Sequence, residues 1–171
     1  MMDLAGKIRC INDYPQEGIV FRDITTLLKD ADGLCEAIDK IKSALEGVEF
    51  DYIIGPESRG FIFGMPISYS LRKGFIPVRK EGKLPAKTKS REYALEYGTA
   101  TVEIHEDAIK KGDRVVIIDD LIATGGTSKA IIELLEEMGA TVEKLVFLIE
   151  LENLEGRKLI GDYNIESIIR Y

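Results

Sequence analysis

Histidine, cysteine and long apolar runs are scarce in this chain of 171 residues. His105 is the only histidine, which disfavours a Ser-His-Asp triad and excludes a histidine-rich metal site. Cys10 and Cys35 lie in segments with a helical pattern, and we expect them to be reduced thiols in the core. No apolar run approaches the ~18 residues of a membrane span, and residues 1–6 lack the charged-then-apolar form of a signal peptide. We therefore expect a cytoplasmic protein without a membrane partner.

Positive charge is also in short supply. The chain has 23 Lys and Arg against 30 Asp and Glu, a net charge of −7. This acidic balance argues against generic binding to nucleic acid. Hydrophobic residues make up 45% of the chain, as in an ordinary globular protein. We expect one domain over residues 1–171, long enough to bury a sizeable core.

One stretch, residues 114–128, combines an apolar run with paired acids and glycines. Residues 115–118 are all β-branched, which is typical of a strand buried on both faces of a parallel sheet. Asp119 and Asp120 stand where that strand should end. A loop of small residues then leads into an amphipathic helical pattern at residues 131–138. This order predicts an α/β fold with a ligand site beyond the carboxyl end of the strand.

The small-residue loop, 123–127, has the chemistry of a phosphate site. A glycine-rich turn before a helix offers backbone N–H groups to an anion, and Thr124 and Thr127 can add hydroxyl donors. No lysine follows the second glycine, so a single phosphate suits the loop better than a triphosphate. The two aspartates suit sugar hydroxyls or a divalent cation. Together they predict a sugar-phosphate site; the alternative is an ordinary strand–turn–helix connection with incidental glycines.

Two more predicted strands end in charged turns. Residues 50–55 lead into a turn that contains Arg59, which by the same rule should lie beside the phosphate loop and suits a second anion. Residues 75–78 lead into a segment, 79–91, with six cations and one acid. A long loop in a compact domain is usually a lid, a binding element or disordered. We expect a cationic lid over an anionic substrate; the alternative is a solvated, highly charged loop.

The acid-acid-x-x-x-Thr-Gly-Gly-Thr pattern of residues 119–127 resembles the signature of the type I phosphoribosyltransferases, which bind phosphoribosyl pyrophosphate. Four more segments look like the members of this family that act on adenine: Val20–Asp23, Glu57–Gly60, Arg79–Pro85 and Leu95–Gly98. The resemblance implies a mainly parallel central sheet flanked by helices, with a flexible hood loop at about residues 80–100. It also implies a purine salvage reaction, in which adenine and phosphoribosyl pyrophosphate give AMP and pyrophosphate.

The resemblance further implies a role for each matching residue. The sugar phosphate would be bound by Asp119, Asp120, Ala123, Thr124, Gly125, Gly126 and Thr127. The pyrophosphate would be bound by Glu57, Ser58, Arg59, Gly60, Arg79, Lys80 and Lys83. Adenine would be bound by Val20, Phe21, Arg22 and Leu151, although composition alone would place Phe21 in the core. Glu96 would accept the purine proton at N7, and Tyr97 would help to orient the site. Members of the family use Mg²⁺ held by substrate oxygens and water, and are commonly homodimers.

Three other functions compete with this interpretation. The first is a phosphoribosyltransferase for another purine, such as hypoxanthine or xanthine; the Val20–Arg22 motif and the Glu96–Gly98 motif argue against it. The second is a phosphoribosyl pyrophosphate-binding regulator of transcription, which should carry a basic DNA-binding domain for which this acidic chain has no spare length. The third is a binding module that has lost catalysis. Glu96 and the cationic segment argue against that module, and only an activity assay decides.

Overall fold

A central sheet of seven strands organises the computed structural model, which describes residues 3–94 and 98–171. Their spatial order is β5-β6-β4-β3-β7-β8-β9. The strands are β3 (Tyr52–Pro56), β4 (Gly74–Lys80), β5 (Thr88–Ala94), β6 (Thr99–His105), β7 (Arg114–Ile122), β8 (Thr141–Glu150) and β9 (Ile165–Arg170). The pairs β4–β3, β3–β7, β7–β8 and β8–β9 are parallel, whereas β5–β6 and β6–β4 are antiparallel. The expected mainly parallel α/β sheet is confirmed.

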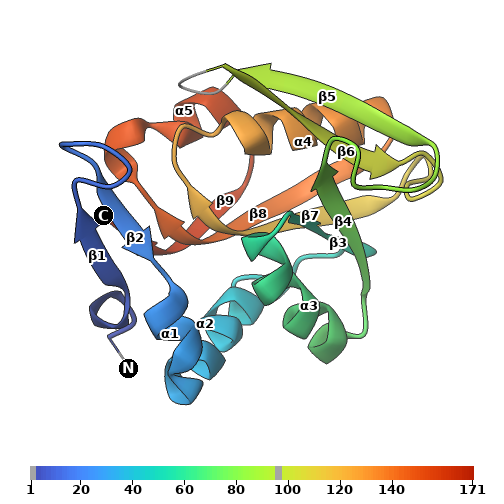
Figure 1. The fold of residues 1–171 in the computed structure, drawn as a ribbon. Helices are drawn as coiled ribbons and strands as arrows, with labels where there is room; N and C mark the ends of the chain where they lie inside the picture. The colour runs from blue at the N-terminus through green and yellow to red at the C-terminus, as the bar shows by residue number, and fades with distance from the viewer. Residues whose placement is uncertain (1–2, 95–97) are drawn as a thin grey trace.

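Helices cover both faces of the sheet (Figure 1). One face carries α1 (Thr25–Lys29), α2 (Ala31–Ser43) and α3 (Arg59–Leu71), and the other carries α4 (Gly126–Glu137) and α5 (Gly156–Ile160). Alternate residues of β7 therefore belong to different cores: Val115 and Ile117 to the one that includes α4, Val116 and Ile118 to the one that includes α3. This double burial explains why the strand is a continuous β-branched run. No helix in the described part of the chain is long and apolar enough to cross a bilayer.

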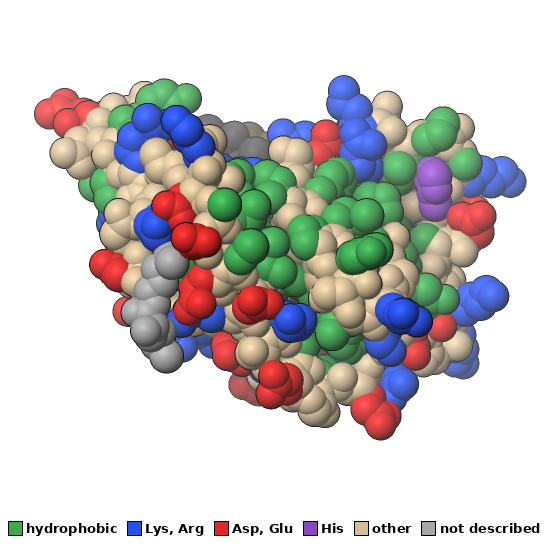
Figure 2. Space-filling view, turned by 90° about the horizontal axis from the view of Figure 1, so that it is seen from below, with side chains coloured by type: hydrophobic (Ala, Val, Ile, Leu, Met, Phe, Trp, Pro, Cys, Tyr) green, Lys and Arg blue, Asp and Glu red, His purple; other side chains and the backbone are tan. Residues whose placement is uncertain are grey.

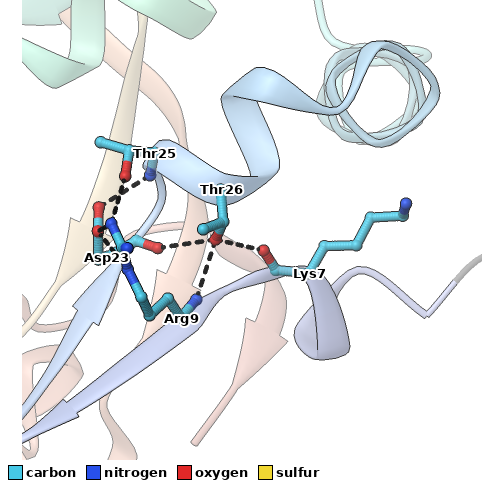
Figure 3. Close-up of polar contacts among 5 residues, drawn as sticks. All are labelled: Lys7, Arg9, Asp23, Thr25 and Thr26. Atoms are coloured by element: carbon cyan, nitrogen blue, oxygen red, sulfur yellow. Dashed lines mark hydrogen bonds and ion pairs between the residues drawn. The ribbon is translucent and has the colours of Figure 1, made fainter.

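An antiparallel hairpin of β1 (Arg9–Asn12) and β2 (Val20–Asp23) lies apart from the main sheet, after a 3₁₀ turn at Ala5–Lys7. Figure 3 shows how it is joined to the start of α1. The backbone N–H of Arg9 on β1 donates to the hydroxyl oxygen of Thr26 at 3.1 Å, and the N–H of Thr25 donates to Oδ1 of Asp23 on β2 at 2.9 Å. The Thr25 N–H and the Arg9 guanidinium both donate to Asp23 and lower its pKa to about 2.

Both cysteines are free and exposed, so the expectation of core thiols is wrong. Cys10 lies on β1, whose four residues are all exposed because the small hairpin sheet stands outside the main core. Cys35 lies on the solvent side of α2, where the buried positions include Ala37 and Ile41 instead. A helical pattern correctly identified α2 but did not decide which face Cys35 occupies.

The charged segment after β4 contains a hairpin rather than a long loop without secondary structure. β5 and β6 pair from Thr88↔His105 to Ala94↔Thr99, and residues 95–97 lie outside the described residues. β5 lies against α4 (Figure 1), where Arg91 contacts Glu137 at 2.9 Å and Glu133 at 3.6 Å. The strand was missed because it has no apolar run; its half-buried positions are Thr88, Arg91 and Tyr93. We keep the name hood for residues 80–100.

Candidate active site

A cavity of about 460 Å³ lies at the carboxyl ends of β3 and β7, two neighbouring parallel strands. This is the edge at which open α/β sheets bind ligands. The lining residues come from the turn after β3, the end of β4, the hood and the loop after β7. They are Pro56, Glu57, Ser58, Arg59, Lys80, Tyr93, Asp119, Asp120, Leu121, Ile122, Ala123, Thr124, Gly125, Gly126, Thr127 and Ser128. All residues predicted to bind the sugar phosphate are in this lining.

The predicted phosphate loop, residues 123–127, leads directly into the first turn of α4. Gly125 is the residue before the helix and has φ of +84°, a left-handed conformation that favours glycine. A Cβ there would lie 2.5 Å from the carbonyl oxygen of Gly156, so both space and conformation require glycine. Since Gly125 has no side chain to cap α4, the N–H groups of the first turn are available to an anion in the cavity.

The paired acids at the end of β7 are held close together. The backbone N–H of Asp120 donates to Oδ1 of Asp119 at 2.8 Å. Burial and the neighbouring Asp120 charge raise the pKa of Asp119 well above its ordinary value. Burial also raises the pKa of Asp120, against the opposing effect of Arg59. Two carboxyl groups that resist ionisation suit hydrogen bonds with sugar hydroxyls better than contact with a phosphate.

The turn after β3 reaches the acid pair through Arg59. Its Nε lies 2.7 Å from Oδ2 of Asp120. Gly60 makes this approach possible, because a Cβ there would lie 3.0 Å from Oδ1 of Asp119 and 2.7 Å from Cδ of Pro56. The predicted pyrophosphate turn and the predicted ribose acids are thus in direct contact, as the switch-point rule anticipated.

Glu57, in the same turn, holds two cationic residues at the end of β4. The Arg79 Nε donates to Oε2 of Glu57 at 2.8 Å, and the Lys80 N–H donates to the same oxygen at 3.0 Å. The hydrogen bond from Arg79 holds the pKa of Glu57 below its ordinary value. The Glu57–Ser58 peptide bond is cis. Lys80 and Arg59 line the cavity, whereas Arg79 and the exposed Lys83 do not.

The residues predicted to bind adenine lie outside the cavity lining. Phe21 is half-buried and meets the ring of Tyr14 edge-on at 5.3 Å between ring centroids. The Arg22 guanidinium lies over the ring of Tyr171, 3.8 Å from its centroid. The N–H of Tyr171 donates to the carbonyl of Glu150 at 2.9 Å, which brings the hairpin beside the end of β8. Leu151 follows directly, so β2 and Leu151 approach the same edge of the sheet.

Glu96 and Tyr97, the predicted catalytic pair, lie outside the described residues. Sequence reasoning overlooked Tyr93, which reaches the cavity from β5. The signal was the alternation within Thr88–Ala94, which puts Arg91 and Tyr93 on the same side of the strand. Among residues 3–94 and 98–171, no three His, Cys, Asp or Glu side chains are grouped so as to hold a metal ion.

Comparison with known proteins connects this site with one family. The phosphoribosyl transferase domain family matches residues 24–170. Adenine phosphoribosyltransferase of Lachnoclostridium phytofermentans is 58% identical over 100% of this chain and 98% of its own. The crystal structure of adenine phosphoribosyltransferase from Thermoanaerobacter pseudethanolicus has a TM-score of 0.95 and 52% identity, with 98% of each chain covered. The Saccharomyces cerevisiae enzyme, crystallised with an imino-altritol bisphosphate and adenine, has a TM-score of 0.90 and 37% identity, with 96% of each chain covered.

Proposed function

The chain belongs to the phosphoribosyltransferase family and is an adenine phosphoribosyltransferase, and from this premise we propose how its residues bind and convert the substrates. The enzyme is a pentosyltransferase of purine salvage: adenine and 5-phosphoribosyl 1-pyrophosphate give AMP and pyrophosphate. One observation carries the assignment of residues. A phosphate loop, an acid pair and an arginine-bearing turn line the same cavity, in the order that a phosphorylated sugar with an anionic leaving group requires.

Residues 123–127 bind the 5′-phosphate through the N–H groups at the start of α4 and the hydroxyls of Thr124 and Thr127. Asp119 and Asp120 accept or share hydrogen bonds with the ribose hydroxyls. The ribose hydroxyls then replace Arg59 as the partner of the Asp120 carboxyl group. The Arg59 guanidinium becomes free to bind the pyrophosphate.

Some of the predicted pyrophosphate residues contact the ligand directly, and others hold those residues in position. Ser58, Arg59 and Lys80 line the cavity and make the contacts. Glu57 acts through others, since its carboxylate fixes Arg79 and the backbone of Lys80. Lys83 belongs to the exposed part of the hood and reaches the leaving group when the substrate is bound.

Adenine binds between the hairpin and the end of β8. Phe21 supplies a flat apolar ring against the base, and backbone groups of Val20 and Arg22 face its edge. Leu151 packs from the other side. The Arg22–Tyr171 contact supports this placement, because it joins β2 to the strand end that carries Leu151.

The reaction exchanges one bond at C1′ of the ribose for another. The C1′–O bond to pyrophosphate breaks through an oxocarbenium-like state, and N9 of adenine forms the new bond. Arg59 and Lys80 stabilise the charge that develops on the departing pyrophosphate. Glu96 takes the proton that adenine sheds, at N7, and Tyr97 orients the closed site. The acid pair and the phosphate loop keep C1′ aligned with the incoming nitrogen.

Magnesium fits this site as an ion that arrives with the substrate. Asp119 and Asp120 already share their oxygens with an N–H and a guanidinium, and no grouping of three ligands exists among the described residues. A hard cation that keeps several waters and binds phosphate oxygens needs no such cage. When bound, it neutralises charge on the pyrophosphate.

We also propose a homodimer that works in the cytoplasm. An exposed apolar stripe on α3 supports the dimer: Ile62, Met65 and Tyr69 expose 37%, 50% and 87% of their surface. Figure 2 shows hydrophobic side chains gathered on the face that carries this helix. Two free thiols suit a reducing compartment.

Thr127→Ala tests the phosphate loop. We expect the KM for phosphoribosyl pyrophosphate to rise about 10- to 100-fold, the loss of a hydrogen bond to a charged group. Thr141→Ala is the matched control, since Thr141 is exposed at the opposite end of the parallel sheet. An unchanged KM in Thr127→Ala would remove the loop from phosphate binding.

A further inference from the structure

Gly156 contacts the phosphate loop from outside the cavity lining. A Cβ on Gly156 would lie 2.3 Å from the carbonyl oxygen of Ala123 and 3.1 Å from the backbone nitrogen of Gly125. The reverse contact is as close, because a Cβ on Gly125 would lie 2.5 Å from the Gly156 carbonyl oxygen. Two backbone segments far apart in sequence therefore touch, and the side chain of Ile122 packs beside the contact, with Cγ1 2.9 Å from the position of a Cβ on Gly156.

Arg157 fixes the position of Gly156. Its Nε and one terminal nitrogen donate to the two oxygens of Glu150 at 2.6 and 2.8 Å, a bidentate pair. The other terminal nitrogen donates to the carbonyl of Ile165 at 2.8 Å, and a further bond reaches the hydroxyl of Ser167 at 3.1 Å. Glu150 is buried, with 6% of its surface exposed. One guanidinium thus joins the start of α5 to the end of β8 and to the first half of β9.

The Glu150–Arg157 contact favours the charged form of both groups. The hydrogen bond from Arg157 lowers the pKa of Glu150, and the same contact raises the pKa of Arg157. The chain between them is also constrained. The N–H of Leu151 donates to the carbonyl of Ile122 at 3.0 Å, and Glu155 has φ of +53° just before Gly156. The backbone of Gly156 is held from both sides.

We propose that Gly156 and Arg157 are positioning residues for the 5′-phosphate: the Arg157–Glu150 pair holds the Gly156 backbone against Ala123 and Gly125, and this contact keeps the phosphate loop in its binding shape. The inference rests on the proposed phosphate-binding role of residues 123–127. Neither residue lines the cavity. A loop that binds through backbone N–H groups depends on such support, because displacement by about 1 Å misdirects its donors.

Arg157→Lys and Gly156→Ala test the proposal, with the Kd of ribose 5-phosphate and the KM of both substrates as readouts. Lysine keeps the charge but loses the fork that reaches both oxygens of Glu150. Gly156 does not have a positive φ, so alanine perturbs the contact with Ala123 rather than the local conformation. We expect each variant to raise the Kd for ribose 5-phosphate and the KM for phosphoribosyl pyrophosphate about tenfold. The KM for adenine should change less than twofold.

Arg170→Lys is the matched control. Arg170 also faces Glu150, at 3.7 Å, but it lies on the edge strand β9 and does not adjoin the loop. Its ribose 5-phosphate affinity should equal that of the wild type. Thermal unfolding of all variants separates a local effect from general loss of structure.

Two results would overturn the positioning role. Suppose that Arg157→Lys and Gly156→Ala both bind ribose 5-phosphate like the wild type while Thr127→Ala binds it more weakly. The loop would then still be the phosphate site, but Gly156 and Arg157 would not be needed to position it. An equal loss of ribose 5-phosphate and adenine affinity, with a lower Tm, would show a structural effect alone. If Thr127→Ala also bound like the wild type, the loop assignment itself would fail.

Discussion

The carboxyl group of Asp119 lies where burial and a neighbouring carboxyl both disfavour its charge. Its pKa is raised in the folded protein, so the stability linked to this group is fully present below the ordinary aspartate pKa. That stability is lost as the pH rises through the folded pKa. A buried carboxyl group such as Asp119, which destabilises the fold when it ionises, is typical of functional sites.

Asp119→Asn should therefore raise the stability of the protein and lower its enzymatic activity. Asparagine still accepts from the N–H of Asp120, so the local geometry is kept. We expect a Tm about 2–4 °C higher at pH 7–8, the shift that about 1 kcal/mol gives in a domain of this size. The gain should shrink as the pH falls below the ordinary aspartate pKa of 3.8, where Asp119 becomes protonated in both the folded and the unfolded state. A Tm below that of the wild type at pH 8 would contradict the cause given for the raised pKa.

Glu96→Gln tests the proton acceptor. Glutamine cannot accept the proton from N7, so kcat should fall by about 100-fold or more while both substrates still bind. Glu92→Gln is the control, because Glu92 is an exposed hood residue on β5. Isothermal titration with phosphoribosyl pyrophosphate, beside steady-state rates, separates turnover from binding. Equal turnover in wild type and Glu96→Gln would exclude Glu96 from the mechanism.

The sequence was sufficient to identify site residues that stand close together in the chain and form a recognisable motif. The glycines, threonines and aspartates of 119–127 form a pattern because they act within one turn. It did not identify Tyr93 or Gly156, whose positions depend on how a distant strand and a short helix fold back on the loop. It also did not anticipate that Glu57 supports Arg79, since that bond joins two different strand ends.

Among the elements, the β5–β6 hairpin is joined to the rest of the fold by ion pairs with α4 and by the pairing of β6 with β4. Its strand β5 presents Arg91 to two acids of α4, and it carries Tyr93 into the cavity. Both partners of Arg91 are partly exposed, so each ion pair contributes less than about 1 kcal/mol. We therefore expect the hood to exchange its amide hydrogens faster than the central strands, and to slow down when substrate binds.

Arg91→Ala should loosen this hairpin. Hydrogen exchange of residues 88–94 should speed up by about 30-fold at most in the absence of substrate, because the loss of two ion pairs of at most about 1 kcal/mol each amounts to about 2 kcal/mol. Lys89→Ala is the control, since Lys89 is an exposed cation two residues earlier in the same strand. Exchange rates that match the wild type would show that Arg91 does not hold β5 on α4.

Sequence predicted the elements to different extents. Buried strands such as β7 are continuous apolar runs, and α2 has an apolar stripe, so both were evident. The strand β5 consists mostly of charged and polar residues, and its pairing with β6, from Thr88↔His105 to Ala94↔Thr99, leaves no apolar run that sequence alone can identify. The segment that contains Cys10 has a helical pattern but forms the strand β1, because four residues have too little periodicity to distinguish a strand from a helix.

For the whole molecule, the exposed face of α3 predicts association. Ile62, Met65 and Tyr69 are spaced three and four residues apart, so they lie along one side of the helix. An apolar stripe of this kind on a helix is typical of a surface that a partner covers. A second copy of the chain is the partner that the proposed homodimer requires.

Met65→Glu should turn the dimer into a monomer. A charge in the centre of an apolar interface would be buried without a partner, which weakens association strongly. Light scattering after size exclusion gives the mass, to be compared with twice 19.1 kDa. Leu159→Glu is the control, because Leu159 is 52% exposed on a different helix, α5. A wild-type monomer, or a Met65→Glu dimer of unchanged stability, would exclude α3 as the interface.

Magnesium-dependent release of pyrophosphate from phosphoribosyl pyrophosphate, with adenine, hypoxanthine, guanine and xanthine tested side by side, examines the central claim most directly. The account predicts release with adenine and not with the three oxopurines. Release with an oxopurine instead would contradict the base site while keeping the phosphate site. No release with any base, despite measurable binding of phosphoribosyl pyrophosphate, would contradict the claim that the protein is an enzyme and favour a ligand-binding role.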